Sequence, residues 1–304
     1  MSKSAGSLAE DPVTALSKQL ASDGYVVDRP LAMALYLAQR LETPVLLEGE
    51  PGVGKTAAAE SLATVTGARL VRLQCYEGLA AHHALYEWDY TRQLLSIRMA
   101  DGSSRSELRS SIFSEEFLLK RPLLEAIWPT DDRPVVLLID EVDRADEEFE
   151  ALLLEVLSQF QITIPELGTV VAQRRPTIIL TANRTRSLSD ALRRRCLYHW
   201  IAFPSLRREI EILQNRLPDA SSSLTEQVCV FVGLIRDGSY RKVPSVSETL
   251  DWLRALTLLQ ADEVEPAVVE ETLGVLLKDS EDIRRFTDQD HDRVYRDFAV
   301  RVTS

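Results

Sequence analysis

The sequence predicts an α/β domain built on a parallel sheet, followed by a smaller all-α domain. Short apolar runs that end in polar residues alternate with helical segments as far as Pro204, a pattern typical of parallel strands joined by crossover helices. Beyond Pro204 only helical periodicity remains, with apolar residues three and four positions apart. We therefore expect a flexible tail over residues 1–20, the α/β domain over 21–204 and a helical domain over 205–304.

A phosphate-binding loop follows the first expected strand. Residues 49–56 fit the pattern G-x-x-x-x-G-K-[ST], in which glycines let the backbone N–H groups surround a polyphosphate. Lys55 would contact the outer phosphates, and the Thr56 hydroxyl could join the coordination of Mg²⁺. The residues expected to contact the nucleotide are Gly49, Glu50, Pro51, Gly52, Val53, Gly54, Lys55, Thr56 and Ala57. The apolar run before the loop and the helix-forming segment after it support a nucleoside triphosphate site.

The remaining elements follow in order along the chain. Apolar runs predict strands over 45–47, 69–75, 133–140, 177–183 and 198–203, and a hairpin from 162–164 with 170–172. Helical spacing predicts helices over 12–20, 30–41, 56–63, 122–128, 145–160 and 187–192. It also predicts helices over 206–217, 224–235, 246–259 and 268–277, then a charged one over 280–300. The aromatic and charged segment 76–111, with a polar cluster at 101–104, is too long for a structureless loop and predicts a projecting insertion.

Polar residues end three of the expected strands: Gln74, the pair Asp140 and Glu141, and Asn183. Ligands of open parallel sheets bind at the carboxyl ends of the strands. Asp140 suits Mg²⁺ coordination, and Glu141 can orient and activate a water against the terminal phosphate. Asn183 could hold that water or sense the phosphate, but it could equally be an ordinary loop amide.

Three consecutive arginines, at 193–195, follow the expected helix 187–192. Cations at the end of a helix complement its dipole. One of them could instead reach the terminal phosphate of a nucleotide in a neighbouring subunit, as an arginine finger. The two roles are compatible for different members of the run, and we favour a finger among them.

Composition narrows the class of protein. The net charge of −12 argues against a large nucleic-acid footprint, although a local basic loop remains compatible with it. Three widely spaced cysteines without a CxxC motif indicate reduced thiols. The four histidines show no metal-ligand spacing, and no apolar run reaches the length of a membrane span. We expect a soluble cytoplasmic protein.

These residues, in this order, resemble an AAA+ ATPase: a P-loop NTPase with a three-layer parallel-sheet domain and an all-α lid. The match covers about residues 25–260. Two inserts, the segment between Gln74 and Pro122 and the hairpin from Ile162 to Val171, resemble those of the MoxR branch. Runs at 75–79, 84–90, 192–196 and 244–249 are similar to the CoxD-type subgroup, associated with maturation of the molybdenum–copper centre of carbon monoxide dehydrogenase.

The resemblance also bears on individual residues. It implies that Arg194 is the finger and that Gln74 sits where a polar switch could restrain Glu141. Many AAA+ lids carry a sensor arginine near 246–247, but none is present there. Arg241 or Lys242 could substitute for it.

The resemblance implies an ATP-driven chaperone that works with Mg²⁺ as a hexameric ring. Its partners would be a von Willebrand factor A domain protein and a molybdenum enzyme client. A nucleic-acid motor is one alternative, since basic residues are available at Arg92, Arg98, Arg105, Arg109, Arg174 and Arg175. The other is a scaffold that binds ATP but scarcely hydrolyses it. The sequence leaves open the client, the ring size and the direction of remodelling.

Overall fold

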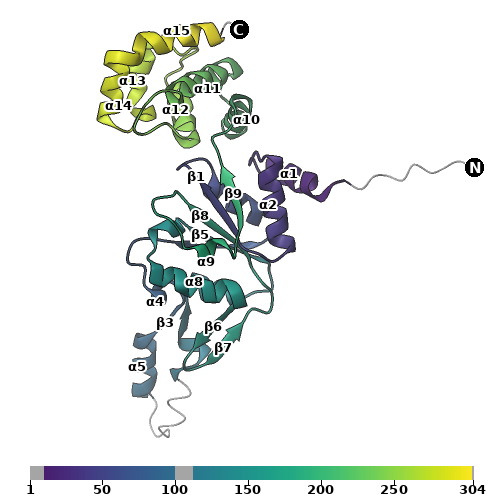
Figure 1. Ribbon diagram of the computed structural model, residues 1–304. Helices are drawn as coiled ribbons and strands as arrows, with labels where there is room; N and C mark the ends of the chain where they lie inside the picture. The colour runs from purple at the N-terminus through teal and green to yellow at the C-terminus, as the bar shows by residue number, and fades with distance from the viewer. Residues whose placement is uncertain (1–9, 100–111, 303–304) are drawn as a thin grey trace, which may run out of the picture. The chain divides into compact units, whose positions relative to one another are not determined.

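The computed structural model describes residues 10–99 and 112–302, and the chain divides into two compact units (Figure 1). The first unit comprises Met1–Asp23, Val27–Glu48 and Thr56–Trp200. The second comprises Gly24–Val26, Gly49–Lys55 and Ile201–Ser304. Most of the phosphate-binding loop therefore groups with the helical part of the chain, and each unit is described by itself below.

A five-stranded sheet in the order β2-β5-β8-β1-β9 forms the centre of the first unit (Figure 1). Its strands are β1 (Val45–Gly49), β2 (Arg69–Gln74), β5 (Val135–Asp140), β8 (Thr177–Ala182) and β9 (Leu197–Ile201). The pairs β1–β8, β5–β8 and β2–β5 are parallel. Every residue of β1 and β5 is buried, as expected for strands covered on both faces. The predicted parallel α/β fold and its five core strands are confirmed.

The strand register determines which side chains meet at one edge of the sheet. Gln74 pairs with Asp140 across β2 and β5, and Ile139 pairs with Leu180 across β5 and β8. The carboxyl ends of these three parallel strands therefore lie side by side. Polar residues at those ends share one edge, as the sequence predicted.

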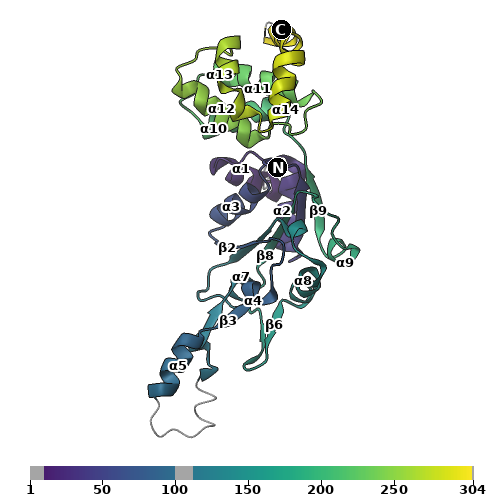
Figure 2. The ribbon, with the colours of Figure 1, turned by 90° about the vertical axis from the view of Figure 1, so that its left-hand side faces the viewer.

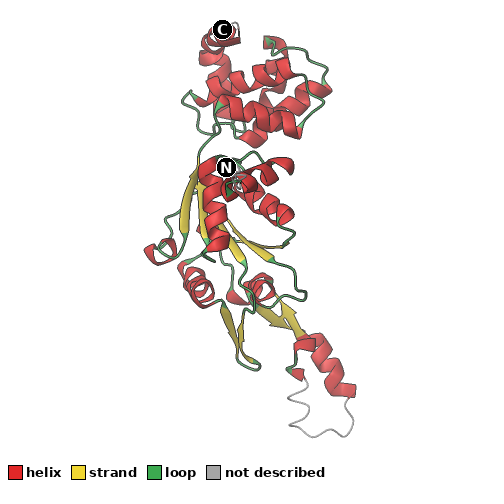
Figure 3. Ribbon diagram, turned by 90° about the vertical axis from the view of Figure 1, so that its right-hand side faces the viewer, coloured by secondary structure: helices red, strands yellow, loops and turns green. Residues whose placement is uncertain are grey.

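Helices flank the sheet (Figure 3). They are α1 (Pro12–Ser22), α2 (Arg29–Arg40), α3 (Lys55–Val65), α7 (Pro122–Ile127), α8 (Glu147–Gln159) and α9 (Asp190–Arg193), with a 3-10 turn η2 (Val142–Arg144). Local sequence explains several of their starts. Asp28 caps α2 by accepting from the Leu31 amide, and Asp146 caps α8 by accepting from the Phe149 amide. Ser189 caps α9, so this helix begins later than the apolar spacing predicted.

Helix α1 lies within the segment that composition had suggested as a tail. The Asp11 carboxylate caps it, Pro12 occupies its first turn, and Val13, Leu16 and Leu20 are buried. Their spacing of three and four puts all three on one face, and α1 contacts α2. The helix predicted over 12–20 is confirmed, so this part of the segment is packed.

Two inserts extend from the first unit (Figure 2). The first contains α4 (Ala81–Ala84), β3 (Tyr86–Trp88), α5 (Tyr90–Met99), the 3-10 turn η1 (Glu115–Phe117) and β4 (Leu118–Lys120), with β3 antiparallel to β4. The second is the hairpin β6 (Gln161–Ile164) and β7 (Gly168–Val171). The projecting insertion and the hairpin are confirmed. The polar cluster at 101–104, and with it Arg105 and Arg109, lies outside the described residues.

The second unit is a helical bundle with its own core. Its helices are α10 (Leu206–Arg216), α11 (Ser222–Arg236), α12 (Val246–Leu258), α13 (Pro266–Leu276), α14 (Ser280–Arg285) and α15 (His291–Val302). Phe231, Trp252 and Phe286 are fully buried at its centre, and the Trp252 indole donates to the Thr272 hydroxyl over 2.8 Å. The all-α region predicted beyond Pro204 is confirmed.

The final charged helix is not continuous. A π-helical turn, η3 (Phe286–Asp290), separates α14 from α15, as happens where tertiary contacts outweigh regular helical bonding. Asp290 is buried in this turn and accepts from Tyr240, Arg285 and Arg293. His291, the residue after this turn, packs against Tyr295 with ring centres 4.7 Å apart.

Candidate active site

The phosphate-binding loop connects β1 to α3 and turns through two left-handed glycines. Gly52 has a φ of +72° and Gly54 a φ of +95°, conformations that L side chains rarely adopt. The buried Lys55 ammonium donates to the Gly49 carbonyl over 2.9 Å and to the Glu50 carbonyl over 2.7 Å. Two carbonyl groups of the loop thus hold the lysine in place. Phosphate oxygens could replace these carbonyl oxygens, because an ammonium group bonds more strongly to a charged phosphate than to a neutral carbonyl.

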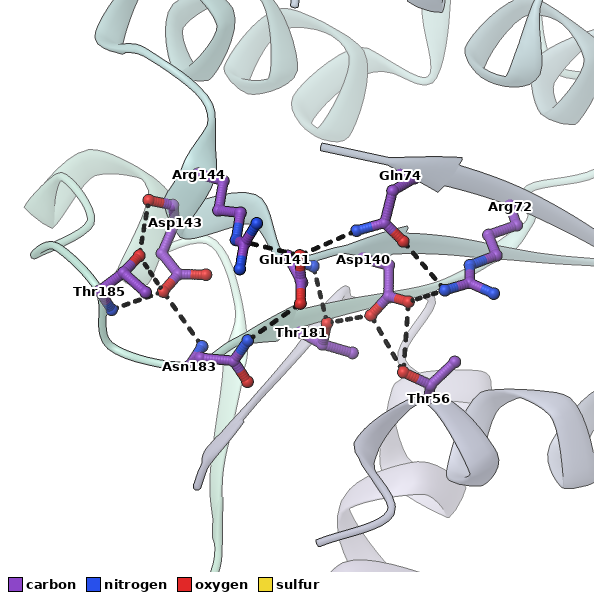
Figure 4. A network of polar contacts seen from close by, with 10 residues as sticks. All are labelled: Thr56, Arg72, Gln74, Asp140, Glu141, Asp143, Arg144, Thr181, Asn183 and Thr185. Carbon is purple, nitrogen blue, oxygen red and sulfur yellow. Dashed lines mark hydrogen bonds and ion pairs between the residues drawn. The ribbon is translucent and has the colours of Figure 1, made fainter. Parts of the chain in front are cut away.

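Asp140 ends β5 as a buried carboxylate surrounded by hydroxyl groups (Figure 4). Thr56 Oγ1 lies 3.1 Å and 3.2 Å from its two oxygens. The Thr181 hydroxyl, from β8, also donates to it. One carboxylate beside a threonine hydroxyl is a set of hard oxygen donors, and Mg²⁺ in nucleotide sites takes few protein ligands besides phosphates and water. The residues present therefore fit Mg²⁺, and Thr56 and Asp140 are the side chains that would hold it.

Glu141 is held in place by three side chains (Figure 4). Gln74 Nε2 donates to Oε2 over 3.1 Å, and Asn183 Nδ2 donates to Oε1 over 3.2 Å. Arg144 Nε also lies 3.1 Å from Oε2. The backbone of Glu141 is left-handed, with φ +55°, a strained conformation that clusters at functional sites. The structure brings Gln74, Glu141 and Asn183 together, as the sequence predicted, and shows that Asn183 contacts Glu141 itself.

Asp143 fixes the segment that carries Asn183. Its buried Oδ2 accepts from the Asn183 amide over 3.1 Å, the Thr185 amide over 2.7 Å and the Thr185 hydroxyl over 2.7 Å. Sequence reasoning assigned no role to Asp143 or Thr185. The segment after β8 is therefore anchored to the segment after β5, which fixes Asn183 relative to Glu141.

Arg72 is a further member of the site that sequence reasoning missed. It precedes Gln74 by two residues on β2, so both side chains lie on the same face of the strand. Arg72 Nη2 lies 2.5 Å from Asp140 Oδ2 and donates to Gln74 Oε1 over 2.9 Å. The alternation of polar residues at 72 and 74 was the available signal.

The three consecutive arginines differ in their surroundings. Arg193 forms an ion pair of 2.6 Å with the buried Glu48. Arg195 donates to the Ser158 hydroxyl over 2.8 Å and to the Ala191 carbonyl over 3.1 Å. Arg194 is exposed and has no recorded hydrogen bond or ion pair from its side chain to the described part of the chain. Arg194 is thus the member of the run whose guanidinium is available to another molecule.

In the second unit, a cavity of about 460 Å³ adjoins the phosphate-binding loop, a size typical of ligand pockets. Gly52 lines it and lies so close to Ser245 that an added Cβ would fall 2.1 Å from the serine hydroxyl. Arg241, Lys242 and Lys278 also line it. Arg241 pairs with Glu281 over 2.6 Å, whereas Lys242 has no recorded side-chain partner within residues 10–99 and 112–302. Lys242 therefore lines the same cavity as the loop residues Glu50, Pro51 and Gly52.

Cys75 lies next to Asp140, and its backbone amide donates to the Asp140 carbonyl over 2.8 Å, but its thiol is not activated. Burial raises the pKa of its thiol to about 12, and the charges of Asp140, Asp143 and Glu141 act in the same direction. Among the described residues no group of three or more His, Cys, Asp or Glu side chains could hold a metal ion, and all three cysteines are free. No helix in the described ranges is long and apolar enough to cross a bilayer.

Comparisons with known proteins give one family and several distant relatives. Replication factor C small subunit of Aeropyrum pernix is 23% identical over 258 residues, which is 84% of this chain and 66% of that protein, just under two thirds of its length. The Thermotoga maritima RuvB Holliday junction branch migration motor is 20% identical at a TM-score of 0.46, covering 88% of this chain and 75% of that one. A point mutant of the same motor is 19% identical at a TM-score of 0.47, covering 93% and 78%.

The family described as AAA domain (dynein-related subfamily) matches residues 44–196. This span is half of the chain and runs from the residue before β1 to the residue before β9. It includes the phosphate-binding loop, Asp140, Glu141, Asn183 and the arginine run. The chain belongs to the AAA domain family, in its dynein-related subfamily.

Proposed function

We propose that this chain is a Mg²⁺-dependent ATPase that remodels a client protein, as MoxR-type AAA+ chaperones do. The observation that carries the ATPase part is the placement of Glu141 beside Asp140. A buried carboxylate bonded to the Thr56 hydroxyl suits a metal–nucleotide site. The next residue presents a second carboxylate, held from two sides by amides. One carboxylate would hold the metal and the other would serve as a base.

Each residue then has a distinct task. The loop amides and Lys55 would bind the phosphates, and Thr56 and Asp140 would hold Mg²⁺, which would neutralise phosphate charge. Glu141 accepts a proton from the attacking water. Asn183 keeps the carboxylate of Glu141 oriented, and Gln74 restrains it from the other side. A general base of this kind contributes about 10²–10⁴-fold to the rate.

Arg194 is assigned as a finger that acts on the nucleotide of a neighbouring subunit. The assignment is supported by its exposure and by the partners that occupy Arg193 and Arg195. A finger in trans requires that subunits assemble, and we propose a hexameric ring. An arginine of this kind contributes about 10³–10⁵-fold to the rate of related nucleotide hydrolases.

Lys242 is assigned as a cation for the phosphates held by the phosphate-binding loop, in place of a sensor arginine near 246–247. Its backbone amide donates to Asp282, a buried carboxylate, over 2.9 Å. The neighbouring Arg241 amide donates to the same carboxylate over 2.9 Å. This support fixes the backbone of Lys242, while the residue lines the cavity that Gly52 also lines.

We further propose that the client is a molybdenum enzyme and that a von Willebrand factor A domain protein takes part. This proposal rests on the sequence resemblance to the CoxD-type subgroup, and the two projecting inserts are the segments we assign to client contact. To test it, a Glu141→Gln variant is purified with ATP from an extract of its native cells. A molybdenum enzyme with a von Willebrand factor A domain protein should co-elute, and their absence in favour of another client would overturn the proposal.

A nucleic-acid motor is the second candidate, because a replication factor C small subunit is among the matched relatives. The basic residues of the inserts bear on it. Arg92 pairs with Glu116 and Arg175 with Glu42, whereas Arg98 and Arg174 are exposed without a recorded partner in the described ranges. DNA that stimulates ATP hydrolysis, with the stimulation lost at high salt, would favour this candidate.

A further inference from the structure

One guanidinium nitrogen links the two catalytic carboxylates through a glutamine (Figure 4). Arg72 Nη2 lies 2.5 Å from Asp140 Oδ2 and 2.9 Å from Gln74 Oε1. Gln74 Nε2 in turn donates to Glu141 Oε2 over 3.1 Å. The contacts form a continuous chain from Asp140, through Arg72 and Gln74, to Glu141.

The donors and acceptors in this series of hydrogen bonds permit only one orientation of the Gln74 side-chain amide. Arginine has only donors, and an ionised carboxylate has only acceptors. Gln74 must therefore turn its oxygen toward Arg72 and its NH₂ group toward Glu141. Arg72 thus determines that Gln74 presents a donor to Glu141, which explains how Gln74 can restrain that carboxylate.

The position of Arg72 on Asp140 conflicts with cation binding. The Asp140 side chain is 4% exposed, and a buried carboxylate needs a positive partner or several hydrogen bonds. Thr56 and Thr181 supply hydroxyl groups, and Arg72 supplies a positive charge in direct contact with the carboxylate. A guanidinium and a divalent cation on the same carboxylate oxygen would repel each other and compete for the same lone pairs.

We propose that Arg72 is a positioning residue that couples cation binding at Asp140 to the release of Glu141. The proposal rests on the ATPase function proposed above. In the structure, Arg72 bridges Asp140 and Gln74, and Gln74 holds Glu141. A divalent cation held by Asp140 would displace Arg72 from the carboxylate, and Gln74 would then lose the contact that orients its amide. Glu141 would then be released from Gln74, while Asn183 still orients it, only in subunits that carry the metal.

A purely structural counter-ion makes different predictions. If Arg72 only balanced the charge of Asp140, its removal would lower stability and leave cation affinity unchanged or weaker. The coupling role predicts a higher cation affinity, because a competitor is removed. Arg72 is 48% exposed, so its substitution should leave folding intact.

The direct test measures binding of Mn²⁺, a spectroscopic substitute for Mg²⁺, to the protein with a non-hydrolysable ATP analogue by electron paramagnetic resonance. Arg72→Ala should bind Mn²⁺ about tenfold more tightly, the size expected when one charged hydrogen bond no longer competes. Arg72→Lys keeps the charge and should stay within about twofold of the parent chain. Arg69→Ala is the matched control, because Arg69 lies on the same strand but pairs with Glu125.

Unchanged or weaker Mn²⁺ binding by Arg72→Ala would overturn the proposal, as would an equal shift in Arg69→Ala. A double-mutant cycle tests the second part of the proposal, the link from Arg72 through Gln74 to Glu141. At Mg²⁺ concentrations below saturation, Arg72→Ala and Gln74→Ala should each raise the ATP hydrolysis rate, and the double variant should exceed neither, because both break the same restraint; at saturating Mg²⁺ the rates should converge on that of the parent chain. Additive effects would also overturn it. If the parent chain bound no metal–nucleotide complex at all, the ATPase function itself would fail.

Discussion

Asn183 Nδ2 lies 3.2 Å from Glu141 Oε1, and so the residue expected to hold the attacking water or sense the phosphate is bonded to the expected base. The contact joins the ends of β5 and β8, which the sheet register already brings together. A base held in this way loses little freedom when it must face a water, and pre-organisation of this kind is a large part of catalysis.

Asn183→Ala should lower the rate of ATP hydrolysis by about 10–100-fold, because Glu141 would lose one of its orienting donors while keeping its charge. The affinity for ATP should change by less than about threefold, since Asn183 contacts the base in this structure and not the phosphate-binding loop. Single-turnover hydrolysis and equilibrium binding of a fluorescent ATP analogue separate the two effects. A loss confined to binding would contradict this role.

Arg194→Ala should abolish hydrolysis in a homogeneous ring, but mixing it with Lys55→Ala protein should restore part of the activity. In a mixed ring, an intact nucleotide site can face an intact Arg194 on the next subunit. Arg195→Ala is the matched control and should keep most of the activity, because Arg195 is engaged by Ser158 and Ala191 of its own chain. No recovery at any mixing ratio would rule out action in trans.

Lys242→Ala should weaken ATP binding on the order of tenfold, as expected for loss of one charge-assisted contact. ADP binding should weaken less if the ammonium contacts the terminal phosphate. Arg241→Ala provides the control, since its guanidinium is held by Glu281 at the same cavity. An equal loss in both variants would show that the net charge of the cavity, and not Lys242, attracts the nucleotide.

Cys75 should resist alkylation in the folded protein. Its pKa is raised to about 12 by burial, so at pH 8 almost all of it is the unreactive thiol. The raised pKa also determines how stability depends on pH. Because the folded state favours the protonated thiol, the free energy of unfolding falls only as the pH rises above 9, the ordinary pKa of a cysteine thiol. Iodoacetamide labelling mapped by mass spectrometry should modify Cys75 rapidly only after unfolding. Rapid labelling of the native chain at pH 8 would show that the site is more open than the structure indicates.

Much of the site could be predicted from the sequence because its signals are local. The loop with Lys55 and Thr56 is a continuous motif, and Gln74, Asp140 and Asn183 each end an apolar run. Parallel strands bring such ends to one edge, so the grouping followed from the fold class alone.

What the sequence could not predict depends on contacts between distant segments. Arg72 bonds to Asp140 only because β2 and β5 pair in one register, although its alternation with Gln74 was visible. The choice among the three arginines required knowing that Glu48 is buried next to Arg193. The π-helical turn at Asp290 depends on Tyr240, fifty residues away in the chain, and no local pattern marks it.

The most direct test of the central claim compares the parent chain with Glu141→Gln in two measurements on the same preparation. Equilibrium binding of a fluorescent ATP analogue with Mg²⁺ should agree within about twofold, because Lys55, Thr56 and Asp140 are untouched. The steady-state hydrolysis rate should fall by about 10²–10⁴-fold, the contribution of a general base. Hydrolysis that survives in Glu141→Gln at a rate near that of the parent chain would contradict the assignment of Glu141 and with it the account of the site.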